Sequence, residues 1–417
     1  NKTVGTDCFA FTPLLAYWLA RATTPVIDRF WKTDFTVDFS LTEEQTLLRD
    51  SVDKYVADHC SVERHRRLCG TELGFDATAW ARFAELGWLG IPFAEEWGGF
   101  AGSATDLMVI AEALGKGLVR EPFLTTVVTC GGFLQRAGSD QQRQQYIPPI
   151  IAGESQWAFA FAERGGGYNL ASVKTEACSG ADCYRLQGAK LAVLNGHCAD
   201  YLLVSARTSG VPGEAAGISL FLVDSTAPGV SRDNFVAVDG SGGANITFDE
   251  VQLAPAQLLG AEGAALPLME AVLDNSLVAL GAEALGAMQV LLDTTVEYTR
   301  TRQQFGQPIG KFQALQHRMA DMYLKVEETR SLLFDAAILA QEGSAETARA
   351  CAALKVKVAE AGRYVAQEAV QLHGGIGMTD ELCVGHHYKR LMLLSKLYGD
   401  ESFYLQKYAD LSARRAV

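Results

Sequence analysis

The stretch RQQFGQPI at residues 302–309 decides how this chain folds, and a second stretch, QLHGGIG at residues 371–377, completes it. Each stretch follows a long amphipathic run. In the first, Arg302 is followed by an aromatic residue, a glycine and a proline, which end or turn a helix. A guanidinium group and several amides at a helix end suit a pyrophosphate. An arginine beside an ordinary turn between helices gives the same pattern, so this stretch alone leaves both interpretations open.

The second stretch makes a ligand-binding role more specific. Glycines such as Gly374 and Gly375 let a backbone approach a ligand closely. On its own, a GGxG turn is equally typical of a helix C-terminus. The two stretches together, separated by two helices' worth of sequence, are much more specific. On these residues the chain, from Phe39 to its C-terminus, resembles the acyl-CoA dehydrogenase family of flavoproteins.

The composition is that of a globular chain with no nucleic-acid or membrane partner. Its 417 residues include 48% hydrophobic and 20% charged residues, which excludes a disordered protein. The net charge of -13 argues against nucleic acid or an anionic membrane as the main partner. The nine cysteines form no CxxC pair. We therefore expect neither a zinc site nor a disulfide framework, and a reducing, cytoplasmic location.

Periodicity divides the chain into helical, β and helical parts. After an N-terminal extension at residues 1–38, a capping box and apolar residues at helical spacing predict a helical domain over residues 39–155. Short apolar runs between Gly and Asp turns predict strands over residues 156–262, typical of a small β-barrel or sandwich. Four long helical runs over residues 263–417, the last near His387–Arg415, predict a four-helix bundle. The resemblance implies the same mainly α fold with a central β-barrel.

The family resemblance implies a reaction as well as a fold. In that reaction a base removes a proton from the carbon next to a thioester, and a hydride passes from the following carbon to a flavin. A carboxylate base and hydrogen bonds to the thioester carbonyl are needed, while the flavin carries the redox chemistry. The resemblance therefore implies FAD as the cofactor, an acyl-CoA as the substrate and an electron-transfer-flavoprotein-like acceptor.

The residues that would hold the ADP part of FAD are all present. His373 belongs to the QLHGGIG stretch and is also expected to touch the cofactor. The resemblance assigns this cofactor-binding role to Arg302, Phe305, Gln371, His373, Gly374 and Gly375.

The side that would hold the flavin ring departs from the family pattern. Where the family has a stretch resembling Thr-Glu-Pro-x-x-Gly-Ser-Asp, residues 162–169 read AERGGGYN. Where the family has Trp-Ile-Thr, residues 192–194 read AVL. The aromatic wall and the hydroxyl group that would reach the flavin are therefore both absent.

The position of the catalytic base departs from the pattern too. One family pattern has a glutamate in a turn near the C-terminus, and in this chain Asp400 or Glu401 would be the base there. The alternative is that Gly399 and Asp400 form a solvated turn that caps the last helix. Another pattern has the glutamate on the first bundle helix, and that position falls near Ser276. Asp274 matches a family position that contacts coenzyme A, and the alternative is an ordinary acid on the helix surface. The family has an arginine that contacts the substrate nearby, and this chain has Leu277 at that position.

Two adjacent histidines complete the set of candidate residues. His386 and His387 are expected on a solvated face of a helix. Neighbouring residues point to different sides of a helix and make a poor metal pair. No metal site is expected.

A chain that retains one half of a shared site suits a partner that retains the other half. In the family the two halves of the FAD site come from different subunits. The tail YGDESFYLQ resembles actinobacterial-type members of the family that work as α2β2 heterotetramers. Those enzymes act on coenzyme A thioesters of steroid side chains and other bulky acids. The leading hypothesis is one subunit of such an enzyme. The alternatives are a self-sufficient homotetramer with Asp400 or Glu401 as base, a non-catalytic scaffold, and a relative that hydroxylates with reduced flavin and oxygen.

Overall fold

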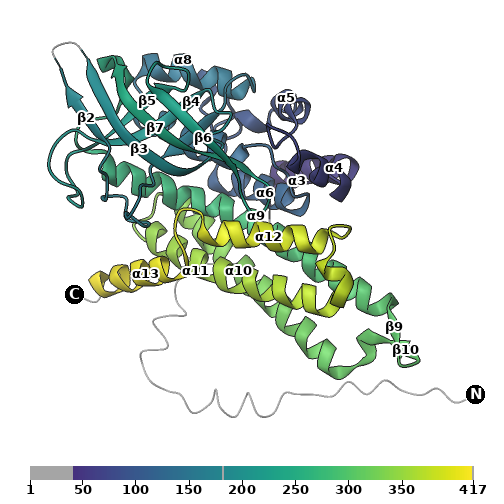
Figure 1. Ribbon diagram of the computed structural model, residues 1–417. Helices are drawn as coiled ribbons and strands as arrows, with labels where there is room; N and C mark the ends of the chain where they lie inside the picture. The colour runs from purple at the N-terminus through teal and green to yellow at the C-terminus, as the bar shows by residue number, and fades with distance from the viewer. Residues whose placement is uncertain (1–40, 181–182, 416–417) are drawn as a thin grey trace, which may run out of the picture. The chain divides into compact units, whose positions relative to one another are not determined.

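The computed structural model describes residues 41–180 and 183–415 (Figure 1). The predicted extension at residues 1–38 lies outside the described residues. From Thr42 onward the chain forms a helical part, a β-sheet and a second helical part, as the sequence predicts. The fold class predicted above is confirmed.

The first helical part begins at the predicted capping box. Thr42 Oγ1 accepts a hydrogen bond from Gln45 N at 3.2 Å, while the Gln45 side chain accepts one from Thr42 N at 3.1 Å. Ser103 and Ser139 begin later helices in the same way. The helices of this part are α3 (Glu43–His59), α4 (Val62–Cys69), α5 (Ala77–Glu85), α6 (Ala104–Lys116), the π-helix η3 (Phe123–Cys130), α7 (Gly131–Ala137) and α8 (Asp140–Ile151).

The central part is one eight-stranded sheet with the order β6-β7-β3-β2-β4-β5-β8, in which β1 pairs with β4 in parallel. Two register shifts in the β3–β7 ladder produce bulges, and the second one, between Lys190 and Val193, places Ala192 at a φ of 52°. The strands are β1 (Trp157–Ala160), β2 (Glu176–Ser179), β3 (Tyr184–Leu194), β4 (Tyr201–Arg207), β5 (Ile218–Asp224), β6 (Val230–Val236), β7 (Gly242–Leu253) and β8 (Leu258–Leu259).

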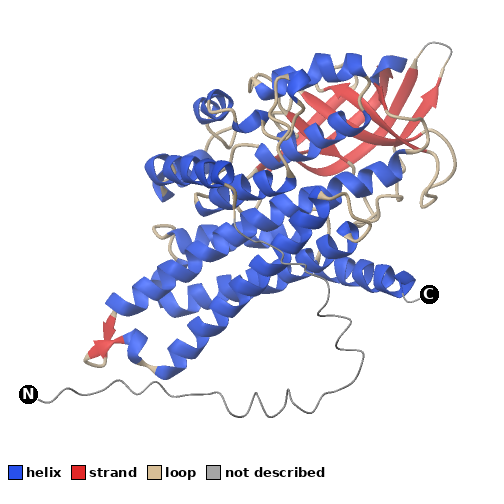
Figure 2. Ribbon diagram, turned by 180° about the vertical axis from the view of Figure 1, so that it is seen from behind, coloured by secondary structure: helices blue, strands red, loops and turns tan. Residues whose placement is uncertain are grey.

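The second helical part is a helical bundle, in which α11 contacts α9, α10, α12 and α13 (Figures 1 and 2). Its last helical run differs from the prediction, because the chain turns between Leu397 and Asp400 and divides the run into two helices. Tyr398 and Gly399 have φ values of 63° and 141° in this turn. The elements are α9 (Ala265–Thr301), the hairpin β9 (Gln303–Gln304) and β10 (Gln307–Pro308), α10 (Gln313–Gln341), α11 (Thr347–His373), α12 (Cys383–Lys396) and α13 (Glu401–Arg415).

Helix α9 is the core helix of the bundle. By length and composition it is the one helix in the described part of the chain that is apolar enough to cross a membrane, but 72% of its most apolar window is buried inside the protein. Gly286 of α9 and Gly115 of α6 face the backbone of the other helix, and a side chain at either position would collide with it. The two helices therefore approach backbone to backbone, which fixes where the side chains of α9 point.

One buried lysine supports the turn between α12 and α13. Lys355 of α11 is 1% exposed, and its Nζ donates a hydrogen bond to Leu394 O in the last turn of α12. An ammonium group near a helix C-terminus satisfies one of the free carbonyl groups. Burial lowers the pKa of Lys355 to about 7 from an ordinary value of 10.5.

Stability should rise with pH because of Lys355. Between about pH 7 and pH 10.5 the unfolded lysine binds a proton that the folded one has lost, so raising the pH stabilises the folded state, by at most about 1.4 kcal/mol per pH unit. We expect urea denaturation of the Lys355→Met variant to lack this slope between pH 7 and 9. Lys357→Met is the control, because Glu328 and Glu360 raise the pKa of Lys357. Equal slopes for the wild type and Lys355→Met would contradict the assignment.

Candidate active site

The two stretches RQQFGQPI and QLHGGIG lie together at one end of the bundle. Arg302 follows α9 directly, and its N donates to Tyr298 O at 2.8 Å. The Tyr298 ring stacks on the His373 ring with a centroid distance of 4.5 Å, which joins the ends of α9 and α11. Figures 1 and 2 show the β9–β10 hairpin at the end of the bundle that points away from the sheet.

The hairpin presents an aromatic side chain to solvent. Phe305 and Gly306 occupy its tip with φ values of 54° and 79°, as a tight two-residue hairpin requires. The Phe305 side chain is 91% exposed, and its ring lies edge-on to the Phe312 ring at a centroid distance of 6.0 Å. A non-glycine residue in this backbone region costs about 1 kcal/mol or more and is typical of functional segments. The hairpin therefore presents a strained, exposed aromatic tip to solvent.

The GGIG turn offers backbone and one free acceptor atom. Gly374 has a φ of 64°, and the space next to Gly374 and Gly375 is open. His373 is 4% exposed, and burial lowers its pKa, so the ring is neutral at pH 7. Its Nδ1 lies 2.8 Å from Ala369 O and carries the proton, whereas Nε2 is a buried acceptor with no hydrogen-bond partner among the described residues.

These features fit the ADP side of a dinucleotide. Arg302 and Gln371 are exposed, and within the described residues Arg302 makes no ion pair. A free guanidinium group and an open glycine backbone together suit a diphosphate. The buried His373 acceptor does not, because phosphate oxygens are acceptors as well. These residues line none of the four main cavities in the described part of the chain. Their ligand would lie on a surface that this chain leaves open.

On the sheet, the acid of the AERGGGYN stretch is structural. Glu163 is buried and pairs with the buried Lys190 at 2.6 Å, and it accepts hydrogen bonds from Lys174 N at 2.7 Å and Thr175 N at 3.1 Å. Burial lowers the pKa of Lys190 to about 8, against the opposing effect of Glu163. This pair fixes the loop between β1 and β2. Both oxygens of Glu163 therefore accept hydrogen bonds from this chain's own residues.

The last residue of the AVL segment lines a small cavity between the first helical part, the sheet and the bundle. Ala192 is exposed in its bulge, and Leu194 lines the cavity. The cavity measures about 80 Å³ and has both apolar and charged walls. Its apolar walls include Leu114, Phe123 and Ala279. The hydrogen-bonding hydroxyl that a flavin ring would meet here is replaced by the leucine.

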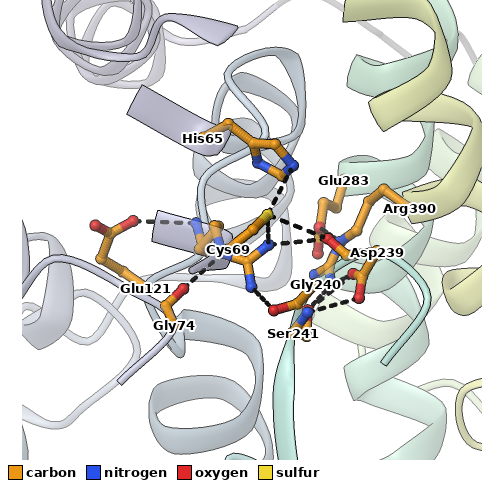
Figure 3. A network of polar contacts seen from close by, with 10 residues as sticks. His65, Cys69, Gly74, Glu121, Asp239, Gly240, Ser241, Glu283 and Arg390 are labelled. Carbon is orange, nitrogen blue, oxygen red and sulfur yellow. Dashed lines mark hydrogen bonds and ion pairs between the residues drawn. The ribbon is translucent and has the colours of Figure 1, made fainter. Parts of the chain in front are cut away.

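A network of ion pairs forms the charged wall of this cavity (Figure 3). Arg390 Nε donates to Glu283 at 2.6 Å, and its Nη1 donates to Asp239 at 2.8 Å and Ser241 Oγ at 3.3 Å. Burial alone would lower the pKa of Arg390, but the two carboxylates raise it above its ordinary value. Burial alone would raise the pKa of Asp239, yet Arg390 and Ser241 hold it below its usual range.

A second arginine joins this network to the first helical part. Arg120 donates to Gly74 O at 2.5 Å, to Asp239 O at 3.0 Å and to Gly240 O. The adjacent Glu121 pairs with Arg64 at 2.5 Å. No local pattern in the sequence marked these residues, because they come from segments far apart in the chain.

The two acids predicted as the base have other partners. Asp400 caps α13, since Phe403 N donates to Asp400 Oδ1 at 3.1 Å, and its Oδ2 lies 3.3 Å from Lys396 Nζ. Glu401 pairs with Arg363 at 3.1 Å on the surface. Neither acid lines the cavity beside Leu194.

The other candidate base position is occupied by neutral hydroxyl groups. Ser276 is fully buried, and its Oγ accepts a hydrogen bond from Thr129 at 3.0 Å while donating to Val272 O at 2.9 Å. Thr129 also lies 3.0 Å from Tyr398 OH. Burial raises the pKa of Tyr398 far above its ordinary value. No proton acceptor with a useful pKa therefore occupies this position.

Asp274 lies in a wall of a second cavity. It is 5% exposed, and Lys407 of α13 donates to it at 2.6 Å. Burial raises its pKa, against the opposing effect of Lys407. The cavity measures about 390 Å³ and also touches Tyr168 and Asn169 of the AERGGGYN stretch. Asp274 is therefore a buried, paired acid and not a surface acid.

The prediction for the adjacent histidines is wrong. His386 and His387 are 7% and 1% exposed, because α12 packs against α9 and α11 and because the His65 ring lies 4.9 Å from the His386 ring. Burial lowers the pKa of His387 to about 3 and that of His65 to about 4. Among the described residues, no three His, Cys, Asp or Glu side chains are placed to share a metal ion.

Comparison with known proteins accounts for the fold. The family models for the acyl-CoA dehydrogenase N-terminal, middle and C-terminal domains match residues 42–154, 158–251 and 262–406. The chain is 31% identical over 365 residues to isovaleryl-CoA dehydrogenase, mitochondrial, of Pongo abelii, covering 86% of this chain and 85% of that protein.

Two solved structures are similar over almost their whole length. A variant of the Tcur3481-Tcur3483 steroid ACAD is 32% identical with a TM-score of 0.81, covering 90% of this chain and 99% of that one. The ChsE4-ChsE5 complex from Mycobacterium tuberculosis is 29% identical with a TM-score of 0.82, covering 90% and 99%. With three domains matched in order over this fold, the chain belongs to the acyl-CoA dehydrogenase family, whose members are FAD-dependent.

Proposed function

We propose that this chain is a subunit of an FAD-dependent acyl-CoA dehydrogenase that catalyses α,β-desaturation of an acyl-CoA thioester. In this proposal it contributes the ADP-side half of the FAD site and works with a homologous dehydrogenase subunit in an α2β2 heterotetramer. The acyl group is a steroid side chain or another bulky acid. Electrons leave through an electron-transfer-flavoprotein-like acceptor, and the location is cytoplasmic.

One observation carries the proposal: the two halves of a flavin site are unequal in this chain. The ADP side has Arg302 unpaired within the described residues and an open backbone at Gly374 and Gly375. The ring side has Leu194 in place of a hydroxyl donor. A chain that serves only as a scaffold has no need for the first half, and a self-sufficient enzyme needs both.

The chain's own residues have distinct roles in this proposal. FAD, when bound, supplies the hydride acceptor. Arg302 would hold its diphosphate, with the backbone at Gly374 and Gly375 allowing close approach, and Gln371 would offer a further polar contact. His373 would support this end of the bundle by stacking on Tyr298. The exposed Phe305 covers the junction with the partner subunit. Asp274 lines the larger cavity, where a coenzyme A chain would pass.

The similar structures support the choice of partner and substrate class. The name of one of them identifies a steroid acyl-CoA dehydrogenase, and another is a complex of two differently named proteins. The self-sufficient homotetramer, with Asp400 or Glu401 as base, remains the second candidate. It is less well supported, because both acids are occupied by Lys396, Arg363 and the α13 cap.

The first test is the ratio of FAD to chain, measured by absorbance. The protein is purified alone and after co-expression with a dehydrogenase subunit encoded beside it. We expect little FAD with the lone chain and about one FAD per pair of subunits in the complex, because each half-site alone makes too few contacts. A lone chain with a full complement of FAD would favour the homotetramer. An FAD-free complex would leave only the scaffold.

Removal of the Arg302 charge should weaken FAD binding by the complex. Loss of a charge-assisted hydrogen bond to a phosphate costs about 1.5–3 kcal/mol, so we expect the dissociation constant of FAD to rise about tenfold to a hundredfold in Arg302→Gln. Flavin fluorescence on dilution measures it. Arg300→Gln is the matched control, since Arg300 is exposed on the same helix end and pairs only weakly with Glu297 at 3.9 Å. Equal FAD loss in both variants would contradict the role of Arg302.

Replacing both tail acids by amides separates the two candidate enzymes. In Asp400→Asn with Glu401→Gln, the α13 cap is retained because asparagine is also a good N-cap residue. We expect kcat of the assembled complex to change by less than about twofold, since the partner supplies the base, whereas loss of a general base lowers kcat by about 100-fold or more. The kcat of the double variant and of the wild-type complex is measured in a steady-state assay with an artificial electron acceptor. A large loss of kcat would identify one of these acids as the base.

A further inference from the structure

The cavity beside Leu194 is too small for an acyl chain. It measures about 80 Å³, whereas pockets that hold small organic ligands usually measure about 300–1,000 Å³. The lining includes apolar side chains that would suit a hydrocarbon, among them Leu114, Phe123 and Ala279. Charged side chains, among them Glu283 and Arg390, line the same small space.

The charged side chains are mutually satisfied. Arg390 pairs with Glu283 and Asp239, whose side chains are 12% and 2% exposed. Arg120 is held by backbone carbonyl groups at Gly74, Asp239 and Gly240, and Glu121 is held by Arg64. Among the described residues that line the cavity, Arg390 and Glu283 are ion-paired, whereas the donors of Arg120 are taken up by backbone carbonyl groups.

The network is also anchored on every side. Arg390 comes from α12, Glu283 from α9 and Asp239 from the turn between β6 and β7 (Figure 3). Glu283 sits where α9 meets α6 backbone to backbone at Gly115. To open the cavity, an acyl chain would have to break ion pairs that are already out of water, which strands buried charges. A rotation of one side chain does not suffice.

We propose that the network of Arg120, Asp239, Glu283 and Arg390 closes this chain's own interdomain cavity to acyl groups. The inference rests on the proposed function and specifies it: the chain helps to bind the flavin of an acyl-CoA site but holds no acyl tail itself. The exclusion covers long and bulky acyl groups, because space is lacking in the cavity beside Leu194. The acyl tail is then held elsewhere in the complex.

The test uses octanoyl-CoA with a photoreactive diazirine at the end of its acyl chain. The full chain, alone and in complex with its partner, is irradiated with this probe, and labelled residues are located by mass spectrometry. We expect no label at Leu114 or Phe123 in the wild type. Ala279 is not scored, because it also lines a separate cavity of about 430 Å³. In Glu283→Ala with Arg390→Ala, labelling at Leu114 and Phe123 should rise at least about tenfold, because an apolar cavity has been opened.

The matched control removes an ion pair of similar length elsewhere. Glu112→Ala with Arg330→Ala deletes a pair of 2.9 Å between α6 and α10 that does not line the cavity, and it should gain no label. If the first double variant does not fold, Glu283→Ala alone is used, in which Arg390 keeps Asp239 at 2.8 Å. Labelling of the cavity in the wild type overturns the inference, as does a folded opening variant that gains no label. A full FAD complement in the lone chain would instead end the proposed function, independently of any label.

Discussion

Every part of the described chain depends on the burial of helix α9. This helix has 37 residues, is largely apolar and packs against α6 and α7 on one side, α10, α11 and α12 on the others, and strand β5 near its start. Its contact with α6 is possible only because Gly115 and Gly286 carry no side chains. An apolar helix of about 55 Å cannot be left in water, so the sheet and both helical parts must assemble around it.

The same helix distributes the candidate functional residues. Asp274 lies in the wall of the larger cavity, Ser276 joins the buried hydroxyl groups, Glu283 pairs with Arg390, and Arg302 follows the last turn. Because a helix is rigid over this length, the end at Arg302 and the sheet-facing end lie far apart within one chain.

Local patterns predicted the order of domains, the capping box at Thr42 and the two stretches that meet at Tyr298 and His373. The break in the final helical run was anticipated only in part: a turn at Gly399 and Asp400 that caps the last helix was one of two interpretations, and Asp400 does cap α13. The left-handed conformation of Tyr398 in that turn was not predicted. The burial of His387 and the network around Arg390 were not predicted either. These features arise from contacts between segments far apart in the sequence, where neither periodicity nor spacing carries information.

The exposed hairpin at Phe305 and Gly306 has a thermodynamic consequence for the proposed assembly. If one surface holds both a cofactor and a neighbouring subunit, the two ligands are linked: FAD must raise the affinity between subunits by the same factor by which the second subunit raises the affinity for FAD. Riboflavin status of the cell would then set how much of the protein is assembled. Conversely, the amount of partner synthesised would set how much flavin this chain sequesters.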